Sequence, residues 1–191
     1  MAQNLSEERR HTITLLVENR SGVLSRVAGL FSGRGYNIDS LSVGETLDPT
    51  VSRMTIVVRA TQAVIAQVIK QLHKLIDVIK VIDLTDEEHV SREMLLLRVN
   101  ADPATRAEIL RIADIFRAKI VDVTPLSYAL EVTGDESKIG AIVELLRPFG
   151  IQELVRTGKV AIARGTKTLS RKDQARLQQL QSAPRAVGYE H

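Results

Sequence analysis

The feature that most constrains the fold is one order of strand-like and helix-like segments, which occurs twice along the chain. In the first half, four β-branched and apolar runs read as strands and are bounded by turn residues such as Asp48-Pro49. Two segments between them carry apolar residues at helical spacing. The expected strands are 12–18, 36–46, 51–60 and 78–85, and the expected helix faces are Val23, Val27, Leu30 and Phe31, then Ile65, Ile69, Leu72 and Ile76.

The second half shows the same order about 80 residues later. Its expected strands are 94–100, 118–124 and 126–134, with a last strand or hairpin over 151–165, and its expected helix faces are Ile109, Ile112, Ala113 and Phe116, then Ile139, Ile142, Val143 and Leu146. An order of β-α-β-β-α-β gives an antiparallel sheet with both helices on one face. The sequence therefore predicts an α+β protein made of two ferredoxin-like βαββαβ domains.

The boundaries follow from changes in composition. A polar stretch, DEEHVSRE at 86–93, separates the two halves and is interpreted as a linker. We expect one domain over residues 11–85 and a second over residues 91–165. Residues 166–191 form a basic, polar tail, which we expect to be partly helical or disordered.

Composition excludes several classes of function. The 191 residues contain no cysteine, so disulfides, thiol catalysis and thiolate metal sites are excluded. The four histidines lack metal-ligand spacing, and no carboxylate pair, His dyad or activated nucleophile stands out, so we expect no catalytic residues and no metal site. A net charge of +3 argues against a general nucleic-acid binder. No run has the length of a membrane span and no signal peptide is evident, so we expect a cytoplasmic protein.

The candidate site is the loop between the first strand and the first helix, Asn19-Arg20-Ser21-Gly22. The first N–H groups of a helix lack internal partners and carry the positive end of the helix dipole, so the amides of Gly22, Val23 and Leu24 can receive a carboxylate or phosphate. Ser21 is the expected N-cap. The loop lacks the lysine of a P-loop and the glycines of a dinucleotide fold, so we expect a small anion. A plain connection made by Ser and Gly is the alternative.

Longer motifs carry a resemblance to a known family. The stretch LVENRSGVLSRVAGLFSGRGYNIDSLSV resembles the opening of an ACT domain, the amino-acid-binding module of metabolic regulation. Together with DPTVSRMTIVV, KQLHKLIDVIKV and IFRAKIVDVTP, it resembles the small regulatory subunits of acetohydroxyacid synthase, also called acetolactate synthase. The resemblance covers about residues 11–165 and leaves out the tail.

This resemblance implies a function and a set of site residues. The first domain would be an ACT domain that forms a homodimer and binds the feedback inhibitor valine at the dimer interface, and the second domain would help to regulate the large catalytic subunit. The valine-binding positions implied by the resemblance are Asn19, Ser21, Gly22, Val23 and Leu24 from one chain, and Asn37 and Ile38 from the other. Thiamine diphosphate, Mg and FAD are expected on the catalytic subunit, with no cofactor on this chain.

The sequence leaves two other functions open: an RNA-binding module and an ACT-domain sensor for a different protein. RNA-recognition modules share the element order, but they stack bases on aromatic residues of the central strands. The corresponding strands here carry only Tyr128, in the second half. The other reading is an ACT-domain sensor for another enzyme or for a transcription regulator, whose first half would look similar.

Overall fold

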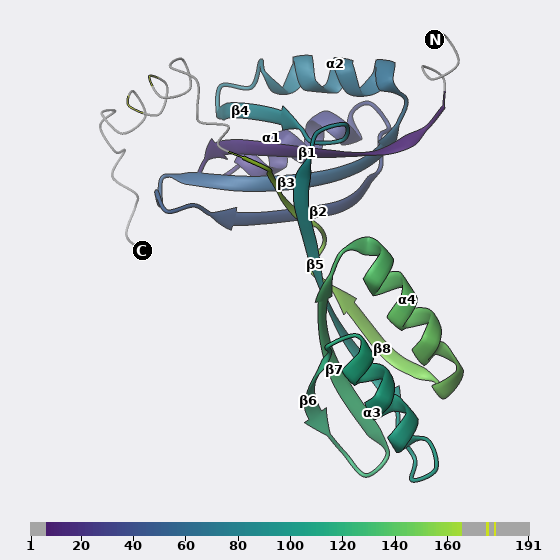
Figure 1. Cartoon of the computed structure of the whole chain (residues 1–191). Helices are drawn as coiled ribbons and strands as arrows, with labels where there is room; N and C mark the ends of the chain where they lie inside the picture. Colours follow the sequence, from purple (N-terminus) through teal and green to yellow (C-terminus); the bar gives the residue numbers. More distant parts are fainter. Residues whose placement is uncertain (1–6, 166–174, 176–177, 179–191) are drawn as a thin grey trace. The chain divides into compact units, whose positions relative to one another are not determined.

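The computed structural model describes residues 7–165 together with Ala175 and Gln178, so the prediction for the tail lies outside the described residues except at those two positions. The chain divides into two units (Figure 1). The first contains the residues up to His89 together with 162–165, and the second contains Val90–Ala161. None of the described helices is long and apolar enough to cross a lipid bilayer.

The first unit has the predicted element order. It consists of β1 (Arg9–Glu18), α1 (Val23–Ser32), β2 (Ile38–Glu45), β3 (Val51–Ala60), α2 (Gln62–Leu72) and β4 (Val78–Asp83). The four strands form an antiparallel sheet in the order β2-β3-β1-β4, in which β1 pairs with β3 over its full length. One face of β1, with Ile13, Leu15 and Val17, packs against the apolar sides of α1 and α2 to make the core. This arrangement is ferredoxin-like, as predicted.

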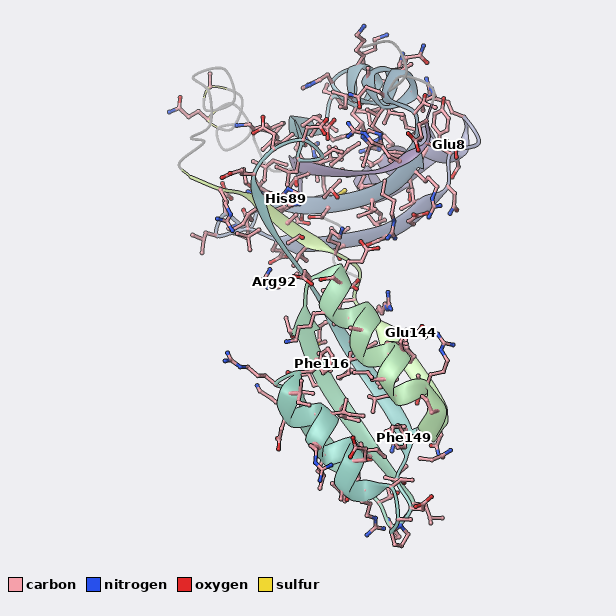
Figure 2. The ribbon with its side chains drawn as sticks, turned by 45° about the vertical axis from the view of Figure 1, so that its right-hand side comes forward. Glu8, His89, Arg92, Phe116, Glu144 and Phe149 are labelled. Atoms are coloured by element: carbon pink, nitrogen blue, oxygen red, sulfur yellow. The ribbon has the colours of Figure 1, made fainter. Side chains whose placement is uncertain are left out.

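The second unit repeats this arrangement with different residues. Its elements are β5 (His89–Asn100), α3 (Arg106–Ile115), β6 (Lys119–Val123), β7 (Ser127–Gly134), α4 (Glu136–Leu146), the 3-10 turn η1 (Arg147–Phe149), β8 (Ile151–Arg156) and β9 (Val160–Ala163). The first residue of β5 and the last two residues of β9 are counted with the first unit. The strand order is β6-β7-β5-β8, and β9 also pairs with β5. The predicted face of α4 is buried in the core, and Phe116 and Phe149, labelled in Figure 2, pack against that core.

Two predicted boundaries are wrong. The stretch at 86–93 is not wholly a linker, because β5 already begins at His89 and Glu93 pairs in register with Gly134 of β7. The face predicted for the second helix does not extend to Ile76, since α2 ends at Leu72 and the Ile76 side chain is 80% exposed. The predicted alternative of a terminal hairpin is also replaced, because β9 pairs with β5.

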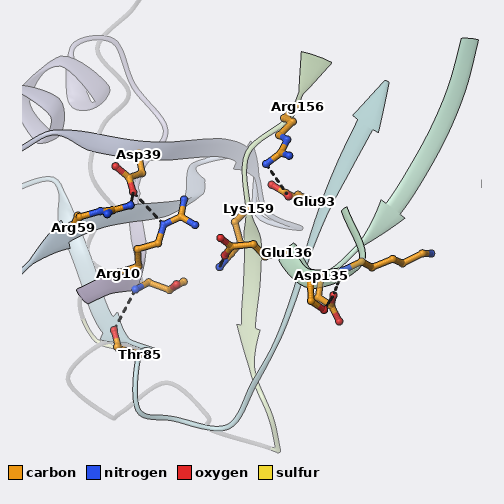
Figure 3. A network of polar contacts seen from close by, with 12 residues as sticks. Arg10, Asp39, Arg59, Thr85, Glu93, Asp135, Glu136, Arg156 and Lys159 are labelled. Carbon is orange, nitrogen blue, oxygen red and sulfur yellow. Dashed lines mark hydrogen bonds and ion pairs between the residues drawn. The ribbon is translucent and has the colours of Figure 1, made fainter. Parts of the chain in front are cut away.

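Polar side chains hold several of these elements in place (Figure 3). In the first unit, Asp39 at the start of β2 accepts a hydrogen bond from Nε of Arg10 on β1 at 3.1 Å. In the second unit, the nearly buried Glu93 pairs with Arg156 of β8 at 3.7 Å. Asp135 caps α4 by accepting from the backbone N–H of Lys138 at 2.9 Å. The hydrogen bond from the Ser137 hydroxyl is the main reason why the pKa of Asp135 lies below its ordinary value.

Candidate functional site

The loop between β1 and α1 makes a tight left-handed turn. Gly22 occupies the N-cap position of α1 with φ 82° and ψ −12°, a conformation that glycine adopts without steric cost. The prediction that Ser21 caps the helix is therefore wrong: Ser21 is exposed, the cap falls one residue later, and no side chain makes a capping hydrogen bond. The turn is closed by the backbone N–H of Val23, which donates to the carbonyl of Arg20 at 3.4 Å.

The start of α1 presents backbone donors to solvent. Within the described part of the chain, the N–H groups of Gly22 and Leu24 donate to no protein acceptor. The first turn of α1 carries no acidic residue, so nothing on the helix offsets the positive end of its dipole, which is equivalent to about half a unit charge. These two amides can receive an anion. The predicted third donor, the N–H of Val23, is instead engaged with the carbonyl of Arg20.

Asn19 is fixed by the turn between β2 and β3. Its side-chain Nδ2 donates to Oε1 of Glu45 at 3.0 Å and to the carbonyl of Pro49 at 2.9 Å. Its backbone N–H donates to the carbonyl of Thr50 at 2.7 Å. The carboxamide donors are thus engaged, and the remaining oxygen is an acceptor suited to an ammonium group. Glu45, which sequence reasoning missed, adds a carboxylate beside it.

An ion pair joins the first turns of α1 to the segment that precedes β4. Nε of Arg26, one turn into α1, donates to Oδ2 of Asp77 at 2.7 Å. The Asp77 carbonyl also accepts from the backbone N–H of Glu18 at 2.9 Å, so the connection between α2 and β4 is attached to the end of β1. Neither Arg26 nor Asp77 was identified from the sequence. The spacing of Arg26, four residues after Gly22 on a helix, is a signal that could have found the arginine.

The apolar residues of the predicted site separate into buried and exposed positions. Val23 is 2% exposed and belongs to the core of the first unit, so only its backbone faces the loop. Leu24 is 44% exposed. Two other exposed apolar side chains lie at this end of the sheet: Leu47 in the β2–β3 turn and Ile76 beside Asp77.

Asn37 and Ile38 do not approach the loop within one chain. Ile38 lies in register with Val58 of β3, which pairs with His11 near the start of β1. The loop follows the opposite end of β1, where Glu45 is the aligned residue of β2. At about 3.4 Å per residue, the seven steps from Ile38 to Glu45 correspond to about 24 Å. The seven predicted residues can therefore form one site only if a second chain contributes Asn37 and Ile38.

Other polar clusters have structural roles. Asp86, from the acidic stretch at 86–89, pairs with Arg9 at 2.6 Å, and the hydrogen bond from Arg9 lowers the pKa of Asp86. No group of three or more metal-ligating side chains gathers anywhere in the described residues. Tyr128, which the RNA-binding reading would need, is 8% exposed in the second core and therefore presents no stacking surface.

The open face of the second sheet carries a depression of about 250 Å³. It is lined by Leu96, Leu97, Arg98, Val121, Asp122, Ala129, Glu153 and Val155. Its charged residues are partly paired with each other, since Nη1 of Arg98 donates to Oδ2 of Asp122 at 2.9 Å.

Comparison with known proteins gives matches over both units. A family model described as the small subunit of acetolactate synthase matches residues 92–165, and one described as an AHAS small subunit-like ACT domain matches residues 13–80. The acetolactate synthase small subunit of Aquifex aeolicus is 58% identical over 158 residues, which are 82% of this chain and 82% of that protein. A probable acetolactate synthase small subunit of Archaeoglobus fulgidus is 57% identical over 83% of this chain and 99% of that protein.

A solved structure agrees with these matches. The crystal structure of the acetolactate synthase small subunit from Thermotoga maritima has a TM-score of 0.75 and 41% sequence identity to this chain. The match covers 82% of this chain and 98% of that one. The resemblance read from the sequence motifs is thereby confirmed.

Proposed function

The chain belongs to the family of acetolactate synthase small subunits, and on that premise we propose that it is a regulatory subunit. It activates the thiamine-diphosphate-dependent catalytic subunit and makes that enzyme sensitive to feedback inhibition by valine. Residues 11–85 form the ACT domain, which binds valine and dimerises, and residues 91–165 form the C-terminal domain of the small subunit. Thiamine diphosphate, Mg and FAD belong to the catalytic subunit.

The pairing of the first sheet supports a dimer of ACT domains. β2 is an edge strand, with β3 on one side and no strand on the other within the described residues. Two copies that join antiparallel along β2, about a two-fold axis at Leu41, place Asn37 and Ile38 of one copy opposite Glu45 and Gly44 of the second. Because Glu45 contacts Asn19, this pairing brings Asn37 and Ile38 of one copy to the Asn19 loop of the other. One site then combines all seven predicted residues.

The chemistry of this combined site suits a branched-chain amino acid. The ligand carboxylate is received by the free amides at the start of α1, with Ser21 and Val23 supplying the surrounding backbone. Its ammonium group is received by Asn19, with Glu45 adjacent, and by Asn37 of the second copy. Leu24 and Ile38 shelter the aliphatic side chain, and burying such a side chain stabilises a complex by about 1.5–3 kcal/mol.

Binding at an interface provides the means of regulation. A ligand that contacts two ACT domains favours the dimer arrangement that binds it better, and it shifts the equilibrium only by that difference in affinity. Couplings of this kind are about 1–3 kcal/mol, which corresponds to a change of about 5- to 150-fold in affinity. The family match over the second unit favours the synthase over another ACT-regulated enzyme.

The observation that carries the proposal is the set of free amides at the left-handed turn of Gly22, next to the fixed Asn19. Reconstitution tests it: the catalytic subunit is assayed with and without this chain, and the mixture is titrated with valine, leucine and isoleucine. We expect the chain to raise synthase activity and valine to lower it again. An unchanged activity in both steps would contradict the proposal.

A further inference from the structure

The Arg26 side chain lies directly over the Gly22 turn. A Cβ atom built on Gly22 would lie 3.2 Å from Nη1 of Arg26. The guanidinium is held in this position because its Nε donates to Oδ2 of Asp77, whose side chain is only 6% exposed. A charge-assisted hydrogen bond to a buried carboxylate fixes the position of an arginine side chain.

The rest of this guanidinium is available to a ligand. Arg26 is 48% exposed, and no described residue accepts a hydrogen bond from its Nη1 or Nη2. The other nearby cation, Arg20, is paired with Glu18. An arginine fork has five N–H donors, so several remain beside the free amides of Gly22 and Leu24. A planar carboxylate matches this fork well.

We propose that Arg26 is a further effector-binding residue, which contacts the carboxylate of the bound amino acid while Asp77 holds it in position. This inference rests on the proposed function of the loop as an amino-acid site, and it narrows the ligand class to molecules with a free carboxylate. Asp77 has two opposite effects on the ligand. Its hydrogen bond orients the guanidinium, and its negative charge weakens the attraction of Arg26 for a second carboxylate.

This geometry predicts opposite results for the two partners of the ion pair. Arg26→Gln removes the cation, so valine should bind at least about tenfold more weakly. Asp77→Asn keeps an oxygen acceptor for Nε but removes the opposing charge, so valine should bind at least as tightly as in the unaltered chain. An ion pair with only a structural role predicts weaker binding in both variants, since either change breaks it.

The experiment measures binding of L-valine and L-valinamide to the full chain by calorimetry. The unaltered chain should prefer valine over the amide at least about tenfold, and this preference should shrink to about twofold in Arg26→Gln. The double variant Arg26→Gln/Asp77→Asn leaves no buried unpaired charge, so it covers the case in which Arg26→Gln fails to fold. It should show the same lost preference.

The outcomes separate this inference from the proposed function. If the unaltered chain binds valine, and either Arg26→Gln or the double variant prefers valine over valinamide as strongly as the unaltered chain does, the role proposed for Arg26 is wrong. The proposed function is not affected by that result. Equal weakening by Arg26→Gln and Asp77→Asn would also overturn the role proposed for Arg26. If the unaltered chain binds neither valine, leucine nor isoleucine, the proposed function fails, and this inference fails with it.

Discussion

Replacing Gly22 with aspartate places a carboxylate where we expect the carboxylate of valine. An L-residue that adopts the left-handed conformation of Gly22 lowers the free energy of unfolding by about 1–2 kcal/mol. An acidic group at a helix N-terminus offsets about 0.3–1 kcal/mol of this loss through the helix dipole. The new side chain also lies beside Arg26, whose Nη1 is 3.2 Å from the added Cβ. The net loss of folding stability should therefore be about 0–1.7 kcal/mol, and the chain should fold.

The effect on valine should be much larger than the effect on folding. The aspartate occupies the free amides and the spare donors of Arg26, so the ligand loses at least one hydrogen bond to a charged group. Such a bond is worth about 1.5–3 kcal/mol, which corresponds to a loss of roughly 10- to 150-fold in affinity. Repulsion between the two carboxylates adds to this loss. Activation of the catalytic subunit should remain, because the change does not touch the second unit.

The assay is valine inhibition of the reconstituted synthase, together with calorimetry on the chain alone. Gly22→Ala serves as the control for steric strain, since it has the same φ and the same Cβ but no charge. Gly29→Asp serves as the control for charge, because it adds a carboxylate to α1 at a position with no atom within 4 Å of the new Cβ. If valine inhibits the enzyme reconstituted with Gly22→Asp as strongly as the enzyme reconstituted with Gly29→Asp, the carboxylate of valine does not bind at Gly22.

Three other predictions concern residues away from this turn. Asn37→Ala should weaken valine binding by about 1–3 kcal/mol without altering the stability of the chain, as measured by calorimetry and urea unfolding. His11 is fully buried and its pKa is lowered by burial, so the unfolded chain binds more protons and stability should fall as pH drops below 6.5. The loss of folding stability is at most about 1.4 kcal/mol per pH unit until the pH passes below the lowered pKa of His11. His11→Leu should make stability less dependent on pH over this range, whereas the control His73→Gln, at an exposed position, should leave this dependence unchanged. Leu130→Ala in the second core should cost about 2–5 kcal/mol in urea unfolding, and Leu126→Ala, at 69% exposure, about 0.5 or less.

The element order could be predicted because each element has a clear periodicity. The strand expected over 51–60 is present residue for residue as β3, and the apolar stripe of the fourth helix is the buried face of α4. These segments are long enough for local pattern and tertiary burial to agree. Ile76 was wrongly assigned to the helix because it follows Ile69 and Leu72 at helical spacing. α2 ends at Leu72, and no glycine or proline marks that end in the sequence.

The start of β5 was harder to recognise because its residues are mostly polar. Residues His89–Glu93 alternate too weakly to resemble a strand, and their extended conformation comes from pairing with strands that lie far away in sequence. The N-cap error has a similar origin. Ser21 has the better capping side chain, but the left-handed turn at Gly22 sets where α1 begins, and backbone dihedrals are not visible in a sequence.

The candidate site was located from the loop sequence and from the family resemblance, and its arrangement across two chains stays a prediction. Asn19 and Gly22 could be identified because they stand between a strand and a helix, where backbone donors are exposed. Asp77 could not be identified, because it is distant in the chain and reaches the loop only through the folded connection between α2 and β4. The separation of Ile38 from the loop likewise depends on strand register, which the sequence does not specify.

The most direct measurement is a crystal structure of the chain grown with saturating valine. We expect valine at an interface between two copies, with its carboxylate within hydrogen-bond distance of the Gly22 and Leu24 amides and of Arg26, and with Asn37 of the other copy on its ammonium group. Valine bound elsewhere, or an empty interface at saturation, would contradict the account.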